Sequence, residues 1–469
     1  MNPRRGPCFH LQEARLRSDE RTEDIQVLFY YHGAFRAERR TDTCGEPLAP
    51  RRTAGGHRIP DERPPGPASP LRQDDARCAA PPGSAEKTAQ EKPAPARRSN
   101  EDLRKVVAAI GSHLVAQIQS GDDPLDLPTD YRRYTTSPLS VAHGASGIAL
   151  FLKRTRGEVP GVFLDALAWK ASRSGDERHA PGLYMGSSGI AWTLLELGLR
   201  REAEALMDSA ARSPILFEIA DMFHGAAGWG LANLFFFTQL GDERYLRNAV
   251  DAFDQIQPRL QRGRGGGFHE DTAAAYHGLA HGPAGVGYFL LRLYRVTGHA
   301  EHLEVARALL DHDLASPGGE AHASVARRRS AADERAPCTS WRSGSAGVGA
   351  VALRFHAALG EERYLEAARK IARQIERGIP SSPANFSGMA GIGNFLVDLH
   401  RRTGEEGYME EARGLADRVM RFALKRPPGL AFPGEDLARV SADYGAGSAG
   451  TGMFIHRVIA GGGLPYFDL

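Results

Sequence analysis

The sequence predicts an all-α fold, an (α/α)7 toroid in which seven helix hairpins with glycine-rich corners close into a ring. The first observation is a phrase, Gly-x-(Ala/Ser)-Gly, that occurs seven times and is followed by an apolar residue in six of the copies. The second is that apolar residues recur at helical spacing after these copies. The third is that the two terminal copies are as apolar as the central ones, whereas an open solenoid needs polar capping repeats. The first glycines of the copies are Gly144, Gly186, Gly225, Gly282, Gly344, Gly388 and Gly447.

Each hairpin is predicted from two segments of different character. The first, such as residues 286–294, is almost wholly apolar and is expected to form a buried inner helix. The second, such as residues 364–375, is amphipathic and is expected to cover the outside. In four copies a glycine suited to a left-handed helix end separates the two segments. These glycines are Gly241, Gly298, Gly360 and Gly404.

The corners are expected to meet at one end of the ring. There, unpaired N–H groups at the starts of the inner helices, together with loop residues, would frame a cavity. The steps between copies are 42, 39, 57, 62, 44 and 59 residues, so long loops precede Gly282, Gly344 and Gly447. Residues 261–272 and 316–337 belong to two of these loops. We expect substrate-binding elements in them, because long loops beside a cavity commonly carry function.

The composition is that of a globular protein and disfavours two classes of partner. Hydrophobic residues make up 42% and charged residues 25% of the chain. A net charge of +2 gives no electrostatic basis for binding nucleic acid. The longest apolar run, residues 231–237, is much shorter than the ~20 residues of a membrane span. No signal segment is visible and only one of four cysteines lies in the repeats, so we expect a reducing, cytoplasmic location.

Two regions are predicted along the chain. Residues 1–98 are expected to be a disordered Pro/Arg-rich tail or linker, because eleven prolines lie between Gly45 and Asn100 among mostly polar residues. A remnant of a lost upstream domain is the alternative, and residues 25–31 could form one strand. Residues 99–469 are expected to form the toroid, starting with Ser99 as the N-cap of its first helix.

The corner residues resemble a known family. The sevenfold repeat, with Ala280-His281-Gly282 at the fourth corner and Ser340-Trp341 at the fifth, resembles the lanthionine synthetase C-like family over about residues 100–460. The sequence pattern around the corners is similar to that of the cyclase domains of class III kinase–cyclase lanthipeptide synthetases. The resemblance implies a toroid in which cysteine thiols of a precursor peptide add to dehydroalanine or dehydrobutyrine. Residues 1–98 contain no kinase motif, so we expect phosphorylation to need a separate protein.

The resemblance also implies a zinc site, whose ligand positions are altered in this chain. In zinc-dependent members, two cysteines and a histidine at the fifth and sixth corners hold a zinc ion that lowers the thiol pKa. These positions are occupied here by Arg342, Phe386 and Ser387. Arginine and phenylalanine cannot bind zinc and serine is a poor ligand, so we expect no metal and no other cofactor.

Two positions that the resemblance associates with acid–base catalysis are retained, Asp221 at the third corner and His281 at the fourth. The enolate formed by thiol addition must be protonated, and a histidine with an ordinary pKa of ~6.5 suits that step. Without zinc, a base must also deprotonate the thiol, and His281, His224 or His277 could supply it. These two histidines are therefore auxiliary candidates.

Two further residues are auxiliary candidates for substrate binding. Arg342 could stabilise the enolate or bind a peptide carboxylate, whereas Trp341 is expected mainly to pack. Structural roles stay open as well. The histidines that precede corner glycines could simply bond the corner, and Asp221 could complement a helix dipole. A metal site at His277 is disfavoured, because glycines interrupt any helix there.

We therefore expect a lanthipeptide cyclase-like protein of ribosomal peptide natural-product biosynthesis that works without zinc. The alternative is a catalytically inactive scaffold that binds the precursor peptide or a partner kinase or lyase. A carbohydrate-acting toroid is disfavoured, because the corners lack the paired acidic residues expected of glycosidases.

Overall fold

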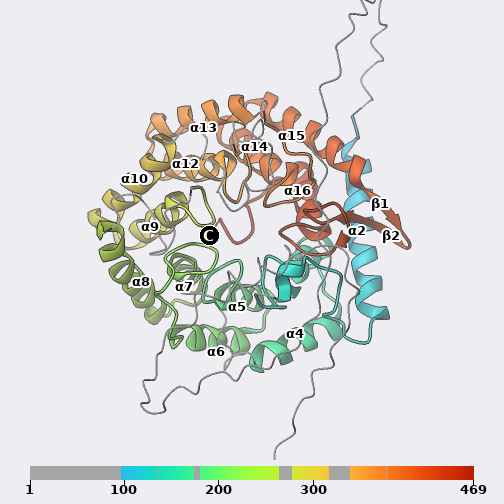
Figure 1. The fold of residues 1–469 in the computed structure, drawn as a ribbon, viewed down its shortest axis with the longest axis horizontal. Helices are drawn as coiled ribbons and strands as arrows, with labels where there is room; N and C mark the ends of the chain where they lie inside the picture. Colours follow the sequence, from blue (N-terminus) through green and yellow to red (C-terminus); the bar gives the residue numbers. More distant parts are fainter. Residues whose placement is uncertain are drawn as a thin grey trace, which may run out of the picture. The chain divides into compact units, whose positions relative to one another are not determined.

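The computed structural model describes residues 97–134, 136–173, 180–262, 277–315, 338–375 and 378–468. In this part of the chain, inner and outer helices alternate around a ring, and the predicted all-α toroid is confirmed (Figure 1). Almost all of the predicted tail, the possible strand at 25–31, the loop at 316–337 and most of the loop at 261–272 lie outside the described residues.

Within the described residues, each layer of the ring contains seven helices. The inner helices are α3 (Ala145–Arg156), α5 (Ser187–Glu196), α7 (Ala226–Leu240), α9 (Pro283–Thr297), α12 (Ser345–Leu359), α14 (Met389–Thr403) and α16 (Ser448–Ala460). The outer helices are α2 (Asn100–Ser120), α4 (Gly161–Arg173), α6 (Arg200–Ala211), α8 (Glu243–Arg262), α10 (Ala300–Ala315), α13 (Glu362–Ile375) and α15 (Glu406–Val419). In the described residues no outer helix follows α16, which packs instead against α2 and, beside it, against the first inner helix α3, so that the ring closes.

The two helix types differ as their sequences predict. Helix α7 is buried from Ala226 to Phe236, whereas α13 buries only one face. Ser99 caps α2 with its side chain, as expected. The four separating glycines all adopt the left-handed conformation at the ends of inner helices. Their φ angles are 69° at Gly241, 73° at Gly298, 71° at Gly360 and 73° at Gly404.

A circle of backbone hydrogen bonds closes the corner end of the ring. In every corner, one residue donates its N–H to a carbonyl of the next corner. The donor is the residue two places before the repeat glycine or, in the second corner, the residue directly before that glycine. The pairs are Ala142–Tyr184 (2.9 Å), Met185–Phe223 (3.1 Å), Phe223–Ala280 (3.2 Å), Ala280–Arg342 (2.8 Å), Arg342–Phe386 (2.9 Å), Phe386–Gly445 (2.9 Å) and Gly445–Ala142 (2.8 Å). The last bond returns to the first corner, so the ring is closed by main chain as well as by packing.

The glycines of the repeat are required by close backbone approach. At the fourth corner, a Cβ on Gly282 would lie 2.4 Å from the carbonyl carbon of His277. A Cβ on Gly285 would lie 2.0 Å from the carbonyl oxygen of Leu279. No side chain fits at such distances, because these contacts are with backbone atoms. The repeated phrase therefore corresponds to a tight turn that leads directly into each inner helix.

The expectation of unpaired N–H groups at the starts of the inner helices is wrong. At the third corner, Ala226 N–H donates to the carbonyl of Ile219 at 2.8 Å, and Ala227 N–H donates to that of Ala220 at 3.2 Å. The same pattern occurs at the first corner, where Ala145 N–H bonds the carbonyl of Pro138 at 3.0 Å. The tight turn brings carbonyls of the corner back over the helix start, and these satisfy the amides that would otherwise bind an anion.

The last described residues occupy the middle of the ring (Figure 1). Tyr466 and Phe467 are fully buried, and the Tyr466 hydroxyl lies 2.7 Å from Thr193 Oγ1. Arg354 holds Asp468 through two hydrogen bonds, of 2.9 and 2.8 Å. The hydroxyl of Tyr288 donates to the carbonyl of Phe467. The centre of the toroid is thus filled by side chains, which the repeat pattern did not predict.

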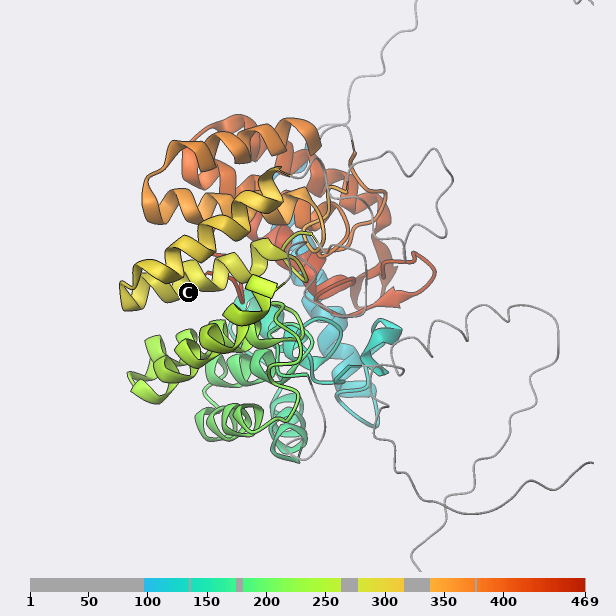
Figure 2. The ribbon, with the colours of Figure 1, turned by 60° about the vertical axis from the view of Figure 1, so that its left-hand side comes forward.

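The long step before Gly447 contains a small antiparallel sheet that the sequence did not predict. Strand β1 (Leu424–Arg426) pairs with β2 (Gly429–Pro433), and β2 pairs with β3 (Val440–Ser441). Two 3-10 helices, η2 (Tyr131–Tyr134) and η5 (Met420–Phe422), are also present. Figure 2 shows this sheet beside the corner loops, toward one end of the helices. None of the described helices combines the length and the apolarity needed to cross a bilayer.

Candidate acid–base site

Asp221 lies in the turn before α7 and caps the third corner. Its Oδ1 accepts hydrogen bonds from the backbone N–H of His224 at 2.6 Å and of Gly225 at 3.1 Å. Burial by itself raises the pKa of this carboxyl, but the charge of His281 and hydrogen bonds from His224 and His281 outweigh it, so the pKa lies well below its usual range. Asp221 is therefore an ionised carboxylate whose Oδ2 faces a partner side chain.

His281, at the fourth corner, is that partner. Its Nδ1 lies 2.7 Å from Asp221 Oδ2, and its side chain is 21% exposed. An ionised carboxylate only accepts, so Nδ1 is assigned the proton and Nε2 the lone pair of the neutral ring. Burial lowers the pKa of His281, and the charges of His224 and Arg342 lower it further, although Asp221 raises it. At neutral pH, His281 is thus a neutral imidazole oriented by Asp221.

His224 lies directly beside this pair. Its ring stacks on that of His281, with centroids 5.3 Å apart and an angle of 18° between the planes. Its Nδ1 lies 3.6 Å from Asp221 Oδ2. The ring of Phe223 covers another side of His281, at 5.4 Å between centroids. The structure therefore brings three of the predicted residues together at one apolar-walled position.

Arg342 brings positive charge to the same junction. Its backbone joins the fourth and sixth corners in the hydrogen-bonded circle. Its guanidinium lies 3.9 Å from Glu435, a residue that follows β2. Burial raises the pKa of Glu435, but Arg342 and Arg132 lower it more strongly, to about 2. Glu435 is consequently an anion that connects the two arginines.

The three positions of the family's zinc ligands do not fit a zinc ion in this chain. Arg342 presents a cation, and Phe386 is buried with its ring stacked on Trp341 at 5.7 Å. The hydroxyl of Ser387 is buried and has no hydrogen-bond partner among the described residues. A single hydroxyl beside a guanidinium and a phenyl ring is not a zinc donor set. Trp341 packs, as expected, within the aromatic cluster at the middle of the ring.

His277 is separated from the Asp221 pair and has a carboxylate of its own. Its Nδ1 lies 3.1 Å from Oδ1 of Asp313, near the end of α10. Oδ2 of Asp313 accepts hydrogen bonds from the N–H of Gly278 at 3.1 Å and of Ala284 at 2.9 Å. Asp313 thus caps the fourth corner from an outer helix. Sequence reasoning did not predict its role, because nothing in its own segment marks it.

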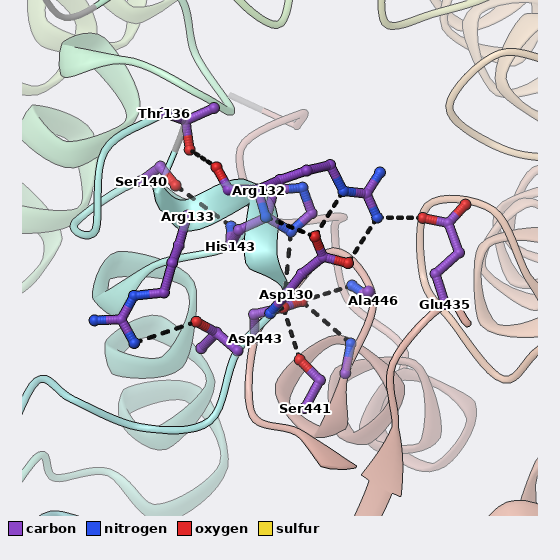
Figure 3. A network of polar contacts seen from close by, with 12 residues as sticks. Asp130, Arg132, Arg133, Thr136, Ser140, His143, Glu435, Ser441, Asp443 and Ala446 are labelled. Carbon is purple, nitrogen blue, oxygen red and sulfur yellow. Dashed lines mark hydrogen bonds and ion pairs between the residues drawn. The ribbon is translucent and has the colours of Figure 1, made fainter. Parts of the chain in front are cut away.

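A second aspartate–histidine pair lies at the junction of the seventh and first corners (Figure 3). Asp443 stands four residues before Gly447, as Asp221 stands four before Gly225. Its Oδ1 accepts from the N–H of Ala446 at 2.7 Å and of Gly447 at 3.2 Å. His143 Nδ1 lies 3.7 Å from Asp443 Oδ2, and both side chains are fully buried. The shared spacing could have identified Asp443 from the sequence.

An ion-pair network continues from this second pair toward Arg342 (Figure 3). The guanidinium of Arg132 binds both oxygens of Asp130, at 2.7 and 2.8 Å, and also pairs with Glu435. The backbone N–H of Asp130 donates to Asp443 at 2.9 Å. The first corner is thereby tied to the β2–β3 loop by charged side chains. Asp130, Arg132 and Glu435 were not predicted, because they come from loops outside the repeat.

Comparisons with known proteins agree with this architecture. The chain is 27% identical over 437 residues to the probable SapB synthase of Streptomyces coelicolor (strain ATCC BAA-471 / A3(2) / M145), covering 87% of this chain and 41% of that protein. The chain therefore spans about two fifths of the length of this relative. Among solved structures, nisin cyclase is similar with a TM-score of 0.52 at 15% identity, over 77% of this chain and 94% of that one. The profile of the lanthionine synthetase C-like proteins matches residues 162–468. The chain belongs to the lanthionine synthetase C-like protein family.

Proposed function

We propose that this chain adds cysteine thiols of a precursor peptide to dehydroalanine and dehydrobutyrine residues, forming thioether rings without zinc. The observation that carries the proposal is the 2.7 Å contact between ionised Asp221 and the neutral, partly exposed ring of His281. A base held by a carboxylate and reachable by substrate is what thiol addition needs in the absence of a metal. We place the reaction in the cytoplasm, with dehydration of the precursor supplied by kinase and lyase activities.

In the proposed reaction, His281 first accepts the thiol proton. The imidazole takes the S–H proton at Nε2 while Asp221 holds Nδ1–H, which stabilises the imidazolium that forms. The thiolate sulfur then attacks Cβ of the dehydroamino acid, and the π electron pair moves to the carbonyl oxygen as an enolate. The imidazolium returns a proton to Cα. The net change is one C–S bond formed and one proton moved from sulfur to carbon.

Arg342 supplies the positive charge that this sequence of steps requires. Both the thiolate and the enolate are anions, and a fixed cation in a partly buried site stabilises each of them. The guanidinium is close enough to His281 for its charge to lower the pKa of that ring. It is also an ion-pair partner of Glu435, which limits its movement. In this proposal Arg342 acts electrostatically and makes no bond to sulfur.

The test is thiol addition with a dehydrated peptide that contains cysteine. The peptide is incubated with the full chain, and free thiols are alkylated and counted by mass spectrometry. We expect faster loss of free thiol than in the peptide alone, and a rate on the order of 100-fold lower for Arg342→Gln. A rate equal to that of the peptide alone, with the peptide still bound to the protein, would instead support the scaffold that binds precursor or partner proteins.

A further inference from the structure

A group of side chains outside the acid–base site has the composition of a metal centre. His277, His312 and Asp313 each offer a ligand atom, and these atoms all lie within 4.8 Å of one another. His277 precedes the fourth corner, whereas His312 and Asp313 lie near the end of α10. Two imidazoles and one carboxylate are a common ligand set for zinc and similar divalent ions.

The two carboxylate oxygens of Asp313 have different partners: Oδ2 is hydrogen-bonded to the backbone, and Oδ1 faces the two histidines. Oδ2 accepts two backbone N–H groups, from Gly278 and Ala284. Oδ1 faces His277 Nδ1 at 3.1 Å and His312 Nδ1 at 3.9 Å. Hydrogen bonds to the non-ligating oxygen of a carboxylate are the usual support of a metal ligand. The side chain of Asp313 is completely buried, which keeps its orientation constant.

The spacing of the three atoms suits a small divalent ion. With metal–ligand distances of about 2.0–2.1 Å, neighbouring ligand atoms of a tetrahedral site lie about 3.4 Å apart. The two contacts of Asp313, 3.1 and 3.9 Å, lie on either side of that value. The imidazole rings are nearly parallel, with 13° between their planes. Because the nitrogen lone pairs lie in the ring planes, one ring has to rotate for both nitrogens to bind a common ion.

A second group of the same composition, Asp221, His224 and His281, serves as an internal comparison. There the Asp221–His281 contact is 2.7 Å, a hydrogen bond shorter than the edge of a tetrahedral zinc site. Access differs at one ligand: the side chain of His312 is 45% exposed, whereas His277, at 18%, is comparable to His224 and His281, at 25% and 21%. Ions from solution can therefore reach the His277 group through His312.

We propose that His277, His312 and Asp313 form a divalent transition-metal site with three protein ligands, of the class that binds Zn²⁺ or Co²⁺. The ion would join the end of α10 to the segment that leads into the fourth corner, and it would keep a position for water. This site is separate from the altered ligand positions at Arg342, Phe386 and Ser387. It is also independent of the proposed thiol addition, so either proposal can fail alone.

Metal binding to the full chain tests this proposal directly. The protein is treated with a chelator and dialysed, and Zn²⁺ is then titrated in competition with a chromophoric chelator. Co²⁺ absorption in the visible range reports the coordination number. We expect one tightly bound ion per chain and an affinity at least about 100-fold lower for His312→Ala, since even changes behind a ligand cost 10- to 100-fold. His312 is substantially exposed, so the variant should fold.

Two control variants assign the ion to its site. His224→Ala removes one member of the comparison group and should leave the affinity unchanged, and so should His299→Ala on the exposed surface. Zn²⁺ should also raise the melting temperature of the wild-type protein, by mass action, but not that of His312→Ala. The proposal is overturned if the wild type binds no more tightly than His312→Ala, or if His224→Ala loses the ion instead.

Discussion

The third–fourth and seventh–first corner junctions carry the same pair of residues in two environments. In each, an aspartate four residues before a repeat glycine caps the corner with Oδ1 and turns Oδ2 toward a histidine from a neighbouring corner. The histidine contact is 2.7 Å for Asp221 and His281 but 3.7 Å for Asp443 and His143. The exposed fractions of the histidine side chains are 21% and 1%.

The difference has a physical cause in the surrounding loops. Oδ2 of Asp443 already accepts the N–H of Asp130 at 2.9 Å and the hydroxyl of Ser441 at 2.8 Å. Its lone pairs are taken, so His143 stays at a distance where no hydrogen bond forms. Neither ring nitrogen of His143 has a hydrogen-bond partner among the described residues. The corner motif therefore sets the backbone turn and its aspartate cap. The neighbouring loops determine whether the histidine is hydrogen-bonded to that aspartate and exposed to solvent.

The largest expected effect separates the two histidines by activity. His281→Gln should reduce the rate of thiol addition about 10²- to 10⁴-fold, because general acid–base groups contribute that much. His143→Gln should leave the rate within a few-fold of wild type, since its ring is enclosed. Mass spectrometry of alkylated peptide measures both. Equal losses in the two variants would mean that the junctions do not differ in chemistry.

The next effect separates the two aspartates by stability. Asp443→Asn should lower the free energy of unfolding by about 2–4 kcal/mol, because hydrogen bonds to a charged group contribute about 1.5–3 kcal/mol each. The new amide N–H would face two other donors, from Asp130 and Ser441. Asp221→Asn should cost less, about 1–2 kcal/mol, because His281 can change tautomer and accept from the amide. Urea denaturation of both variants checks this order, and a reversed order would contradict it.

The smallest effect concerns the pH dependence of the reaction. Burial and Arg342 lower the pKa of His281, so the rate should fall on the acid side only below the pH at which an ordinary histidine is protonated. Asp221 raises that pKa and Arg342 lowers it. The acid limb of kcat/KM should therefore move to lower pH in Asp221→Asn and to higher pH in Arg342→Gln. Shifts in the same direction in both variants would show that another group controls this limb.

Much of the fold could be predicted from the sequence because its signals are local. The repeat glycines are forced by backbone contacts within one corner, and the apolar spacing is a property of single helices. Asp221 and His281 were predicted from the resemblance of their corners to those of the family, and each lies inside a corner phrase. Asp443 lies in the equivalent phrase, and its position four residues before Gly447 is a local signal of the same kind.

Other parts of the site could not be predicted, because they depend on contacts between distant segments. Glu435 meets Arg342 from a β-hairpin loop, and Asp313 caps the fourth corner from an outer helix. Tyr466 and Phe467 fill the middle of the ring, a position defined by elements from all around the chain. None of these residues has a periodic or motif-based signal in its own segment.

The sequence by itself determined that this chain is a ring of seven helix hairpins with a histidine at the fourth corner, because close approach and amphipathicity act over a few residues. Only the tertiary structure decided which histidine has a hydrogen-bonded carboxylate and access to solvent. It did so because hydrogen-bond capacity and burial are set by groups that come together across the ring, such as Asp130, Ser441 and Asp443.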